Sequence, residues 1–295
     1  MRFTKDGITT YVAGGLGNQL FMLAAGWEQA ARLDCPLYLD TSTFAVNRLR
    51  GYGLDQLDVP AIRLGPAQSP WRTVRLPRGR HWPVPRRYPG PVYLERSVAH
   101  FSPKIFRVRP GTSLVGYFQS PHYFPGVREA LIDSLWRVPE SPEETAVIAD
   151  FRSRPAVTLH LRRGDYLSAD SNKDFLATVA YALRAVRVVR RAGYDQHVRV
   201  FTDSVDLVRD ELREIDGVEL VDKDVQLGDF ATLKAMAAGT AMIMSNSSFS
   251  WWAAILMRSQ SGQQDSLVIA PRPWTASGES RADMLEADWI TLDAR

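Results

Sequence analysis

The chain has 295 residues, of which 45% are hydrophobic and 23% are charged. This length predicts about two domains, and this composition excludes a disordered or fibrous protein. The single cysteine, Cys35, excludes an internal disulfide and a cysteine-rich zinc site. One cysteine also fits a reducing compartment, so we expect a cytoplasmic protein.

No run of roughly 18 apolar residues, the length that spans a bilayer, occurs in the chain. The apolar run Leu20–Trp27 follows two basic residues, as in a signal peptide, but Asp6 and a glycine-rich turn lie where the apolar core should begin, and no cleavage site follows. We therefore expect neither a membrane span nor a signal peptide.

Most of the positive charge lies in one segment. The net charge is +3, yet residues 63–109 hold eleven basic residues and one acidic residue, Glu95, so the rest of the chain is net acidic. The basic residues are Arg63, Arg72, Arg75, Arg78, Arg80, Arg86, Arg87, Arg96, Lys104, Arg107 and Arg109. Such a segment could bind nucleic acid, an anionic membrane or a phosphate-bearing substrate, or could be a solvated irregular region. It lacks the aromatic and basic platform of a nucleic-acid module, so we expect no nucleic acid, while peripheral contact with the inner face of the membrane remains open.

The first elements in chain order predict a parallel β–α–β unit. Apolar residues recur first with strand spacing and then with helical spacing. The expected elements are a strand at residues 8–13, a glycine turn at 14–17, a helix from 18 that ends at 34–36, and a strand at 37–39.

Residues 60–125 hold twelve of the eighteen prolines. Proline removes a backbone donor and disrupts helices, so this density excludes long helices and central strands. We predict an irregular excursion with short strands at residues 91–94 and 113–118.

The pattern changes near residue 150, where we place the boundary between domains of residues 1–150 and 151–295. The expected strands are 156–161, 198–202, 218–221, 241–244 and 267–270, and the expected helices are 174–191, 205–214, 230–238 and 250–257. This alternation predicts an open, Rossmann-like parallel sheet whose ligand lies beyond the carboxyl ends of the strands.

Two arginines leave the carboxyl end of the strand at 156–161, in the sequence His160-Leu-Arg162-Arg163-Gly-Asp165. Alternate residues share a face of a strand, so His160 and Arg162 should point one way and Arg163 the other. A guanidinium group binds phosphate bidentately, so the pattern indicates a diphosphate site. The alternative is a structural pair of Arg163 with Asp165.

A serine-rich loop, Ser-Asn-Ser-Ser-Phe-Ser-Trp-Trp at residues 245–252, joins the strand at 241–244 to a helix. Hydroxyl groups and free backbone N–H groups at a helix N-terminus form an anion site. Ser248 or Ser250 could instead only cap the helix, although four serines and Asn246 exceed what a cap requires.

The glycine turn, Gly14-Gly15-Leu-Gly17-Asn18-Gln19, indicates a close approach to the backbone or a positive φ. It lacks the third glycine of a dinucleotide-binding motif.

Other residues have weaker signals. Asp222 and Asp224 could hold a cation, but the five histidines show no paired metal spacing, so we expect no metal. Asp203 follows the strand at 198–202 and could bind a ribose or a base, or cap the next helix.

Six motifs occur in a characteristic order. They are GGLGNQLF at residues 14–21, GYFQS at 116–120 with Tyr123-Phe124, HLRRGDY at 160–166, FTD at 201–203, SNSSFSWW at 245–252 and APRPW at 270–274. Together they resemble the bacterial α-1,2-fucosyltransferases of glycosyltransferase family 11. The resemblance implies a GT-B-like fold of two facing α/β domains, with an acceptor-side N-terminal domain and a GDP-sugar-binding C-terminal domain.

The resemblance also implies an inverting, metal-independent transfer of L-fucose from GDP-fucose to a hydroxyl group of a glycan acceptor, α-1,2 to galactose. Another fucosyl linkage or another nucleotide sugar is the alternative. Arg162 is then catalytic through the β-phosphate, and we add Asp165 as a candidate base because it follows the arginines. The expected donor-binding residues are Gly15, Gly17, Asn18, Gln19, His160, Arg163, Asp203, Asp229, Asn246, Ser247, Ser248 and Phe249. Asp229 is expected at the guanine, although counting back from Asn246 places the family's aspartate nearer Thr232.

Overall fold

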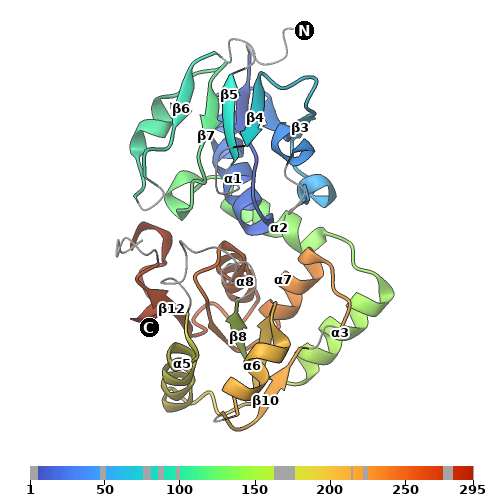
Figure 1. Cartoon of the computed structure of the whole chain (residues 1–295), viewed down its shortest axis with the longest axis vertical. Coiled ribbons are helices and arrows are strands. Elements are labelled where there is room, and N and C mark those ends of the chain that lie inside the picture. Colours follow the sequence, from blue (N-terminus) through green and yellow to red (C-terminus); the bar gives the residue numbers. More distant parts are fainter. Residues whose placement is uncertain are drawn as a thin grey trace. The chain divides into compact units, whose positions relative to one another are not determined.

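A computed structural model describes residues 6–46, 51–75, 81–85, 90–97, 100–162, 177–213, 215–221, 225–274 and 282–294. The chain divides into two compact units, Met1–Val138 and Pro139–Arg295 (Figure 1). The division comes before residue 150 because helix α3 (Pro142–Ser153) packs against helix α7 (Asp229–Ala237) of the second unit.

The first unit is built on a parallel sheet with the strand order β3-β2-β1-β7-β6. Its first three elements are β1 (Ile8–Tyr11), α1 (Leu16–Arg32) and β2 (Leu37–Asp40), which confirms the β–α–β prediction. The other long helix of the unit is α2 (Arg128–Arg137), and four 3-10 helices complete the described part: η1 (Ser42–Ala45), η2 (Leu54–Gln56), η4 (Pro103–Arg107) and η5 (Pro121–Tyr123).

The proline-rich excursion supplies more strands than expected. Its strands are β3 (Ala61–Leu64), β4 (Trp71–Arg75), β5 (His81–Pro85), β6 (Val92–Leu94) and β7 (Ser113–Val115). The prediction that it holds no central strand is wrong, because β7 lies between β1 and β6 in the sheet. The three residues of β7 include no proline, so all their N–H groups can pair. Two of the prolines, Pro83 and Pro85, lie in the separate antiparallel hairpin β4–β5.

The second unit is a parallel sheet with the strand order β10-β9-β8-β11-β12-β13. Its strands are β8 (Val157–Leu161), β9 (Val198–Thr202), β10 (Val218–Leu220), β11 (Ala241–Ile243), β12 (Val268–Arg272) and β13 (Ile290–Asp293). Besides α3 and α7, its described helices are α5 (Val179–Arg191), α6 (Val205–Glu211), α8 (Ser248–Arg258) and the short η7 (Ala282–Met284). Counted from β8, the strand order is 3-2-1-4-5-6, which is the Rossmann order. The expected class is confirmed: the chain is α/β and GT-B-like, with a parallel sheet in each unit.

Strand β13 was not predicted, and it ties distant parts of the second unit together. It pairs with β12 along its whole length. The carbonyl group of Ala294, just beyond β13, accepts hydrogen bonds from the backbone nitrogen and the hydroxyl group of Thr178, at 3.0 and 3.1 Å. Thr178 is the N-cap of α5, so β13 also fixes the start of that helix.

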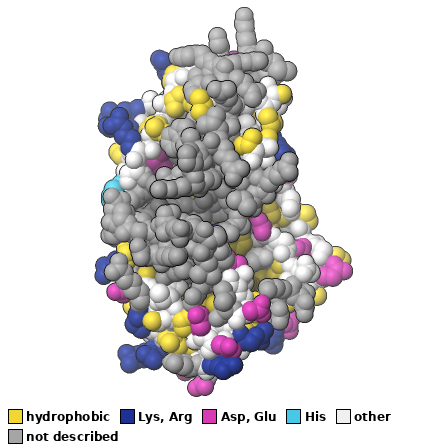
Figure 2. Space-filling model, in the orientation of Figure 1, with side chains coloured by type: hydrophobic (Ala, Val, Ile, Leu, Met, Phe, Trp, Pro, Cys, Tyr) yellow, Lys and Arg dark blue, Asp and Glu magenta, His cyan; other side chains and the backbone are white. Residues whose placement is uncertain are grey.

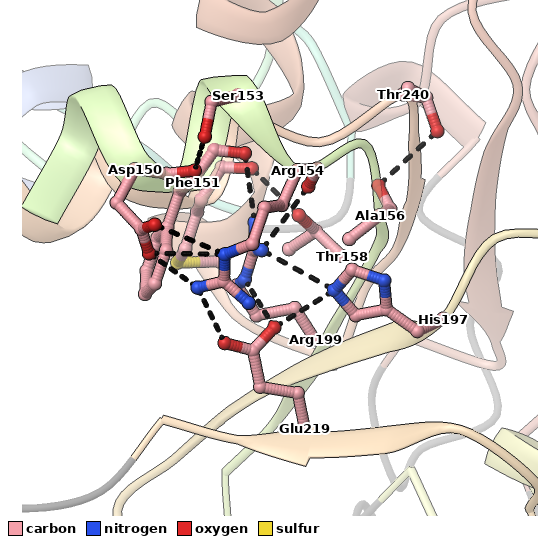
Figure 3. A network of polar contacts seen from close by, with 11 residues as sticks. Asp150, Phe151, Ser153, Arg154, Ala156, Thr158, His197, Arg199, Glu219 and Thr240 are labelled. Carbon is pink, nitrogen blue, oxygen red and sulfur yellow. Dashed lines mark hydrogen bonds and ion pairs between the residues drawn. The ribbon is translucent and has the colours of Figure 1, made fainter.

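The buried side chain of Arg199, near the amino end of β9, connects α3 to the sheet (Figure 3). The side chain of Arg199 is fully buried, and its guanidinium carbon lies 3.9 Å from the centre of the Phe151 ring. Oε2 of Glu219 on β10 accepts from Arg199 at 3.0 Å and lies 2.9 Å from Nε2 of His197, and Oε1 accepts from Arg154 at 3.0 Å. A charge in the interior is tolerated only with such partners, so this network is structural.

Charge differs sharply between the units. The first unit has 18 basic and 9 acidic residues, and the second has 18 basic and 24 acidic residues. On the face drawn in Figure 2, most of the visible acidic side chains lie over the second unit. None of the helices in the described part of the chain is both long and apolar enough to cross a membrane.

Candidate functional site

The strand order of the second unit reverses between β8 and β11, and ligands of such sheets bind at the carboxyl ends of these two strands. His160 occupies the end of β8, and Ser245 follows β11. The hydroxyl oxygen of Ser245 lies 2.9 Å from Nδ1 of His160, and both residues are buried. The hydroxyl group of Tyr181 on α5 donates to the carbonyl group of Met244 at 2.8 Å, which holds the end of β11 in place.

His160 is uncharged at neutral pH. Burial and, to a smaller extent, the positive charge of Arg162 lower the pKa of the imidazole to about 4, although Asp203 opposes this shift. A neutral imidazole carries one N–H donor and one acceptor. The side chain can therefore contact a ligand at this strand end by hydrogen bonding without adding charge.

Arg162 and Asp203 lie at the ends of neighbouring strands, β8 and β9. Nε of Arg162 is 3.9 Å from a carboxylate oxygen of Asp203, and both side chains are partly exposed. A partly exposed ion pair of this length contributes about 1 kcal/mol or less. Asp203 does not cap α6: the N-cap is Ser204, whose hydroxyl group lies 3.2 Å from Asp203.

A pocket of about 300 Å³ opens beside these residues, and it lies wholly within the second unit. The carboxyl ends of β8 and β9, the segment after β10, and helices α7 and α8 contribute its walls. The lining residues are His160, Phe201, Thr202, Asp203, Val221, Val225, Leu227, Asp229, Thr232, Met236 and Phe249. Apolar walls with a few polar groups are typical of a site for a flat organic ligand.

The pocket contains both candidates for the base-binding position. Asp229 is the first residue of α7 and is exposed, whereas Thr232 is half-buried one turn later. Both line the pocket, so the structure accommodates either alignment of the family's aspartate.

The hydroxyl groups of Ser247 and Ser250 in the serine-rich loop form hydrogen bonds within the loop and at the start of α8. Ser247 is the N-cap of α8 and accepts from the backbone nitrogen of Phe249 at 3.3 Å, so the assignment of the cap to Ser248 or Ser250 is wrong. Ser250 donates back to the carbonyl groups of Ser245 and Ser247. The side-chain amide of Asn246 donates to the carbonyl groups of Pro273 and Trp274, at 3.1 and 3.2 Å.

This arrangement fixes the loop around the N-terminus of α8. Ser248 begins the helix, and the ring centre of Phe249 lies 6.3 Å from that of His160. The positive end of the helix dipole therefore lies beside the switch point, as an anion site requires.

The glycine turn belongs to the first unit. Gly14 has a φ of +81°, the left-handed conformation that glycine adopts without strain. Gly15 is the N-cap of α1, and a Cβ there would meet nothing within 4 Å, whereas Gly17 is buried inside the helix. Asn18 accepts a hydrogen bond from Gln119 at 2.7 Å.

Gln19 holds a neighbouring loop. Its side-chain nitrogen donates to the carbonyl groups of Gly14 and Gly51, at 2.9 and 2.8 Å, and its oxygen accepts from the backbone nitrogen of Gly53 at 2.9 Å. The amide is buried, and these bonds use its donors and its acceptor within the fold.

The structure thus brings together His160, Arg162, Asp203, Asp229 and Phe249, with Asn246, Ser247 and Ser248 in the adjoining loop. The glycine-turn residues lie in the other unit. Arg163 and Asp165, and likewise Asp222 and Asp224, lie outside the described residues. Within the described ranges, no group of three His, Cys, Asp or Glu side chains is placed to hold a metal ion.

Sequence reasoning missed the role of Ser245 and most of the apolar wall. Val221, Val225, Leu227 and Met236 are ordinary hydrophobic residues, and their spacing along the chain gives no sign that they share a pocket. Ser245 belonged to a recognised loop, but its partner His160 is 85 positions earlier.

Comparison with known proteins gives relatives of nearly the same length. The α-1,2-colitosyltransferase of Escherichia coli is 25% identical over 97% of this chain and 99% of its own length. The O-antigen biosynthesis glycosyltransferase WbnK of Escherichia coli is 23% identical over 95% of this chain and 99% of its own.

Solved structures with similar folds include two fucosyltransferases. NodZ α-1,6-fucosyltransferase, which was soaked with GDP-fucose, is 16% identical over 85% of this chain and 92% of its own, with a TM-score of 0.47. POFUT1 in complex with GDP-fucose is 12% identical over 90% of this chain and 98% of its own, with a TM-score of 0.43.

The family comparison covers more than half of the chain. The family described as glycosyl transferase family 11 matches residues 113–293, a range that includes the whole described pocket and the serine-rich loop. The chain belongs to glycosyl transferase family 11 and is a glycosyltransferase.

Proposed function

We propose that this glycosyltransferase moves L-fucose from GDP-fucose to a hydroxyl group of a glycan acceptor, forming an α-1,2 linkage to galactose with inversion and without a divalent metal. The observation that carries the proposal is the pocket at the switch point, which combines an apolar slot, an acidic side chain and a nearby arginine.

The slot suits guanine. Val221, Val225 and Met236 supply apolar walls for a flat ring. Guanine presents two adjacent donors, the N1–H and the exocyclic amino group, and a carboxylate such as that of Asp229 can accept from both. Adenine and uracil lack this pair of donors, so the carboxylate favours GDP over ADP and UDP. Asp203 and Thr202, at the end of β9, also line the pocket, and we assign them to the hydroxyl groups of the ribose.

The diphosphate then lies toward Arg162 and the N-terminus of α8. As the bond between fucose and the β-phosphate breaks, negative charge grows on the departing GDP. Arg162 and the positive end of the α8 helix dipole would stabilise this charge, which is the task a divalent metal has in other transferases. Asp165 remains our candidate for the base that takes the proton of the acceptor hydroxyl.

The name of one relative suggests an alternative donor substrate. The similar chain from Escherichia coli is named a colitosyltransferase, and colitose is fucose without its 3-hydroxyl group. GDP-colitose would place the same nucleotide in the same pocket, so the two donors differ only at the sugar.

The decisive experiment incubates the purified chain with GDP-fucose or GDP-colitose and a panel of galactose-terminated glycans, with and without EDTA. We expect fucosyl transfer, an α-1,2 linkage in the product, inhibition by GDP at concentrations where UDP and ADP have no effect, and full activity in EDTA. Transfer from GDP-colitose but not from GDP-fucose would show that the donor sugar is colitose and would reject fucose. Failure to transfer sugar to any galactoside would contradict the proposed acceptor.

A substitution at Asp229 tests the assignment of the pocket to guanine. Asp229→Asn keeps the shape of the side chain but loses the paired acceptors, so we expect GDP to inhibit about tenfold less while ADP changes little. Asp265→Asn, at an exposed position after α8, is the matched control and should leave both values unchanged.

A further inference from the structure

The GYFQS motif at residues 116–120 contributes nothing to the donor pocket, yet the first unit holds it rigidly. It follows β7, at the carboxyl edge of the first sheet. Glu95, at the end of the neighbouring strand β6, accepts hydrogen bonds from the backbone nitrogens of Tyr117 and Phe118 at 2.7 and 3.1 Å. One carboxylate thus fixes two consecutive peptide groups.

The same contact explains the glycine that opens the motif. A Cβ on Gly116 would lie 2.4 Å from the Cβ of Glu95, so a larger residue would push the carboxylate away. Phe118 has a φ of +52°, a conformation that costs a non-glycine residue about 1–3 kcal/mol. Its ring is fully buried, with its centre 5.4 Å from that of Tyr123, and this packing holds the strained residue in place.

Tyr117 lies between these two constrained residues, Gly116 and Phe118. Its own side chain is 40% exposed. Partial burial and the Glu95 carboxylate raise the pKa of its phenol, so the hydroxyl group stays protonated. Strained backbone that is stabilised by its surroundings clusters at ligand sites. Here the strained residue, Phe118, places its own ring in the core, while the residue before it, Tyr117, stays partly exposed.

Gln119, two residues later, donates to Asn18 at 2.7 Å and joins the motif to the first turn of α1. The partly exposed aromatic ring of Tyr117 matches a pyranose, which has one apolar C–H face. The C–H groups of the sugar are attracted to the negative face of an aromatic ring.

We propose that Tyr117 is the stacking surface of a sugar-binding subsite in the first unit, and that the ring it binds belongs to the acceptor glycan. The assignment of this sugar to the acceptor rests on the proposed function, because a transferase with its nucleotide pocket in the second unit needs a separate binding site for the acceptor. Glu95 is a positioning residue in this subsite, since it acts through the backbone of Tyr117.

The test measures sugar binding without any nucleotide. The purified chain is applied to an array of β-galactosides, α-galactosides and N-acetylhexosaminides, and the affinity for the glycans that bind is then determined for each variant. We expect Tyr117→Ala to bind about tenfold more weakly than the unaltered chain and Tyr117→Phe to bind within about twofold of it. Leu94→Ala removes a similarly exposed apolar side chain beside Glu95 and should bind as the unaltered chain does.

Binding of Tyr117→Ala at full strength, with an unchanged melting temperature, would overturn the proposal, and so would a chain that binds no glycan on the array. Because GDP-fucose is absent, the outcome is separate from that of the transfer assay. Glycan binding that depends on Tyr117 without fucosyl transfer would preserve the subsite and reject the donor. In the transfer assay, the same variant should raise the KM for the acceptor and leave the KM for the donor unchanged.

Discussion

The hydroxyl group of Ser245 is hydrogen-bonded to Nδ1 of His160 across the point where the Rossmann sheet changes direction. If the hydroxyl donates, the single proton of the neutral ring lies on Nε2, which is then a donor for an anionic ligand. Ser245 would therefore set the tautomer of a residue that lines the pocket.

Replacing Ser245 by alanine tests this relationship. The buried Nδ1 atom loses its partner, so we expect the Nε2–H tautomer to lose its dominance and the KM for the donor to rise several-fold, with a loss of about 1–3 kcal/mol in the free energy of unfolding. Nitrogen-15 NMR of the histidine rings reports the tautomer directly, with His160→Gln to assign the signal. Ser259→Ala, at the end of α8, serves as the control, and an unchanged tautomer in Ser245→Ala would contradict the role.

His160 should also shape the pH dependence of stability. Its pKa is about 4 in the folded protein and 6.5 in the unfolded chain, so the unfolded chain binds the proton first as the pH falls. Stability is unaffected by this group above pH 6.5 and decreases from there toward pH 4, by about 3 kcal/mol in all. Urea unfolding at several pH values should show a shallower decrease for His160→Gln. A ring that titrates near 6.5 by NMR would refute the assignment.

Arg162 is expected to act in the chemical step. Arg162→Ala should lower kcat by about a hundredfold or more, which is the usual loss when one donor to developing charge is removed. Arg162→Lys keeps the charge but not the bidentate geometry and should recover only part of the rate. Arg152→Ala, on the exposed face of α3, is the control. Activity of Arg162→Ala within a few-fold of the unaltered chain would remove Arg162 from the mechanism.

Glu219 should matter for stability and not for catalysis. Glu219→Gln leaves the fully buried Arg199 without its anionic partner, and such a change costs about 3 kcal/mol or more. The network lies at the amino end of the strands, away from the pocket, so we expect an unchanged kcat at temperatures where the variant is folded. Urea unfolding measures the loss, with Glu211→Gln as the exposed control. A midpoint equal to that of the control would show that the network does not support the fold.

The sequence predicted the second unit well because its signal is local. Each strand is a short apolar run between turn residues, and β9 begins and ends at the predicted residues, Val198 and Thr202. Most strand and helix ends differ by one to three residues from the expected ones. The alternation of strands and helices then predicts an open parallel sheet, which the structure confirms, and the prediction of a ligand site follows from the carboxyl ends of its strands.

What the sequence did not predict depends on distant partners. Strand β7 is central because β1 and β6 pair with it, and the surrounding prolines concealed that role. The pairing of Ser245 with His160 requires β8 and β11 to be neighbours, which the residue types alone do not indicate. The burial of Arg199 depends on Phe151 and Glu219, which lie on other elements.

The contact between Ala294 and Thr178 has a consequence for synthesis in the cell. The sheet of the first unit is complete once β7 has been made, so this unit can fold while the ribosome is still translating the second. The N-cap residue of α5, by contrast, finds its partner only when residue 294 emerges. Nascent chains stalled before residue 290 should therefore expose the second unit to protease while the first unit resists digestion.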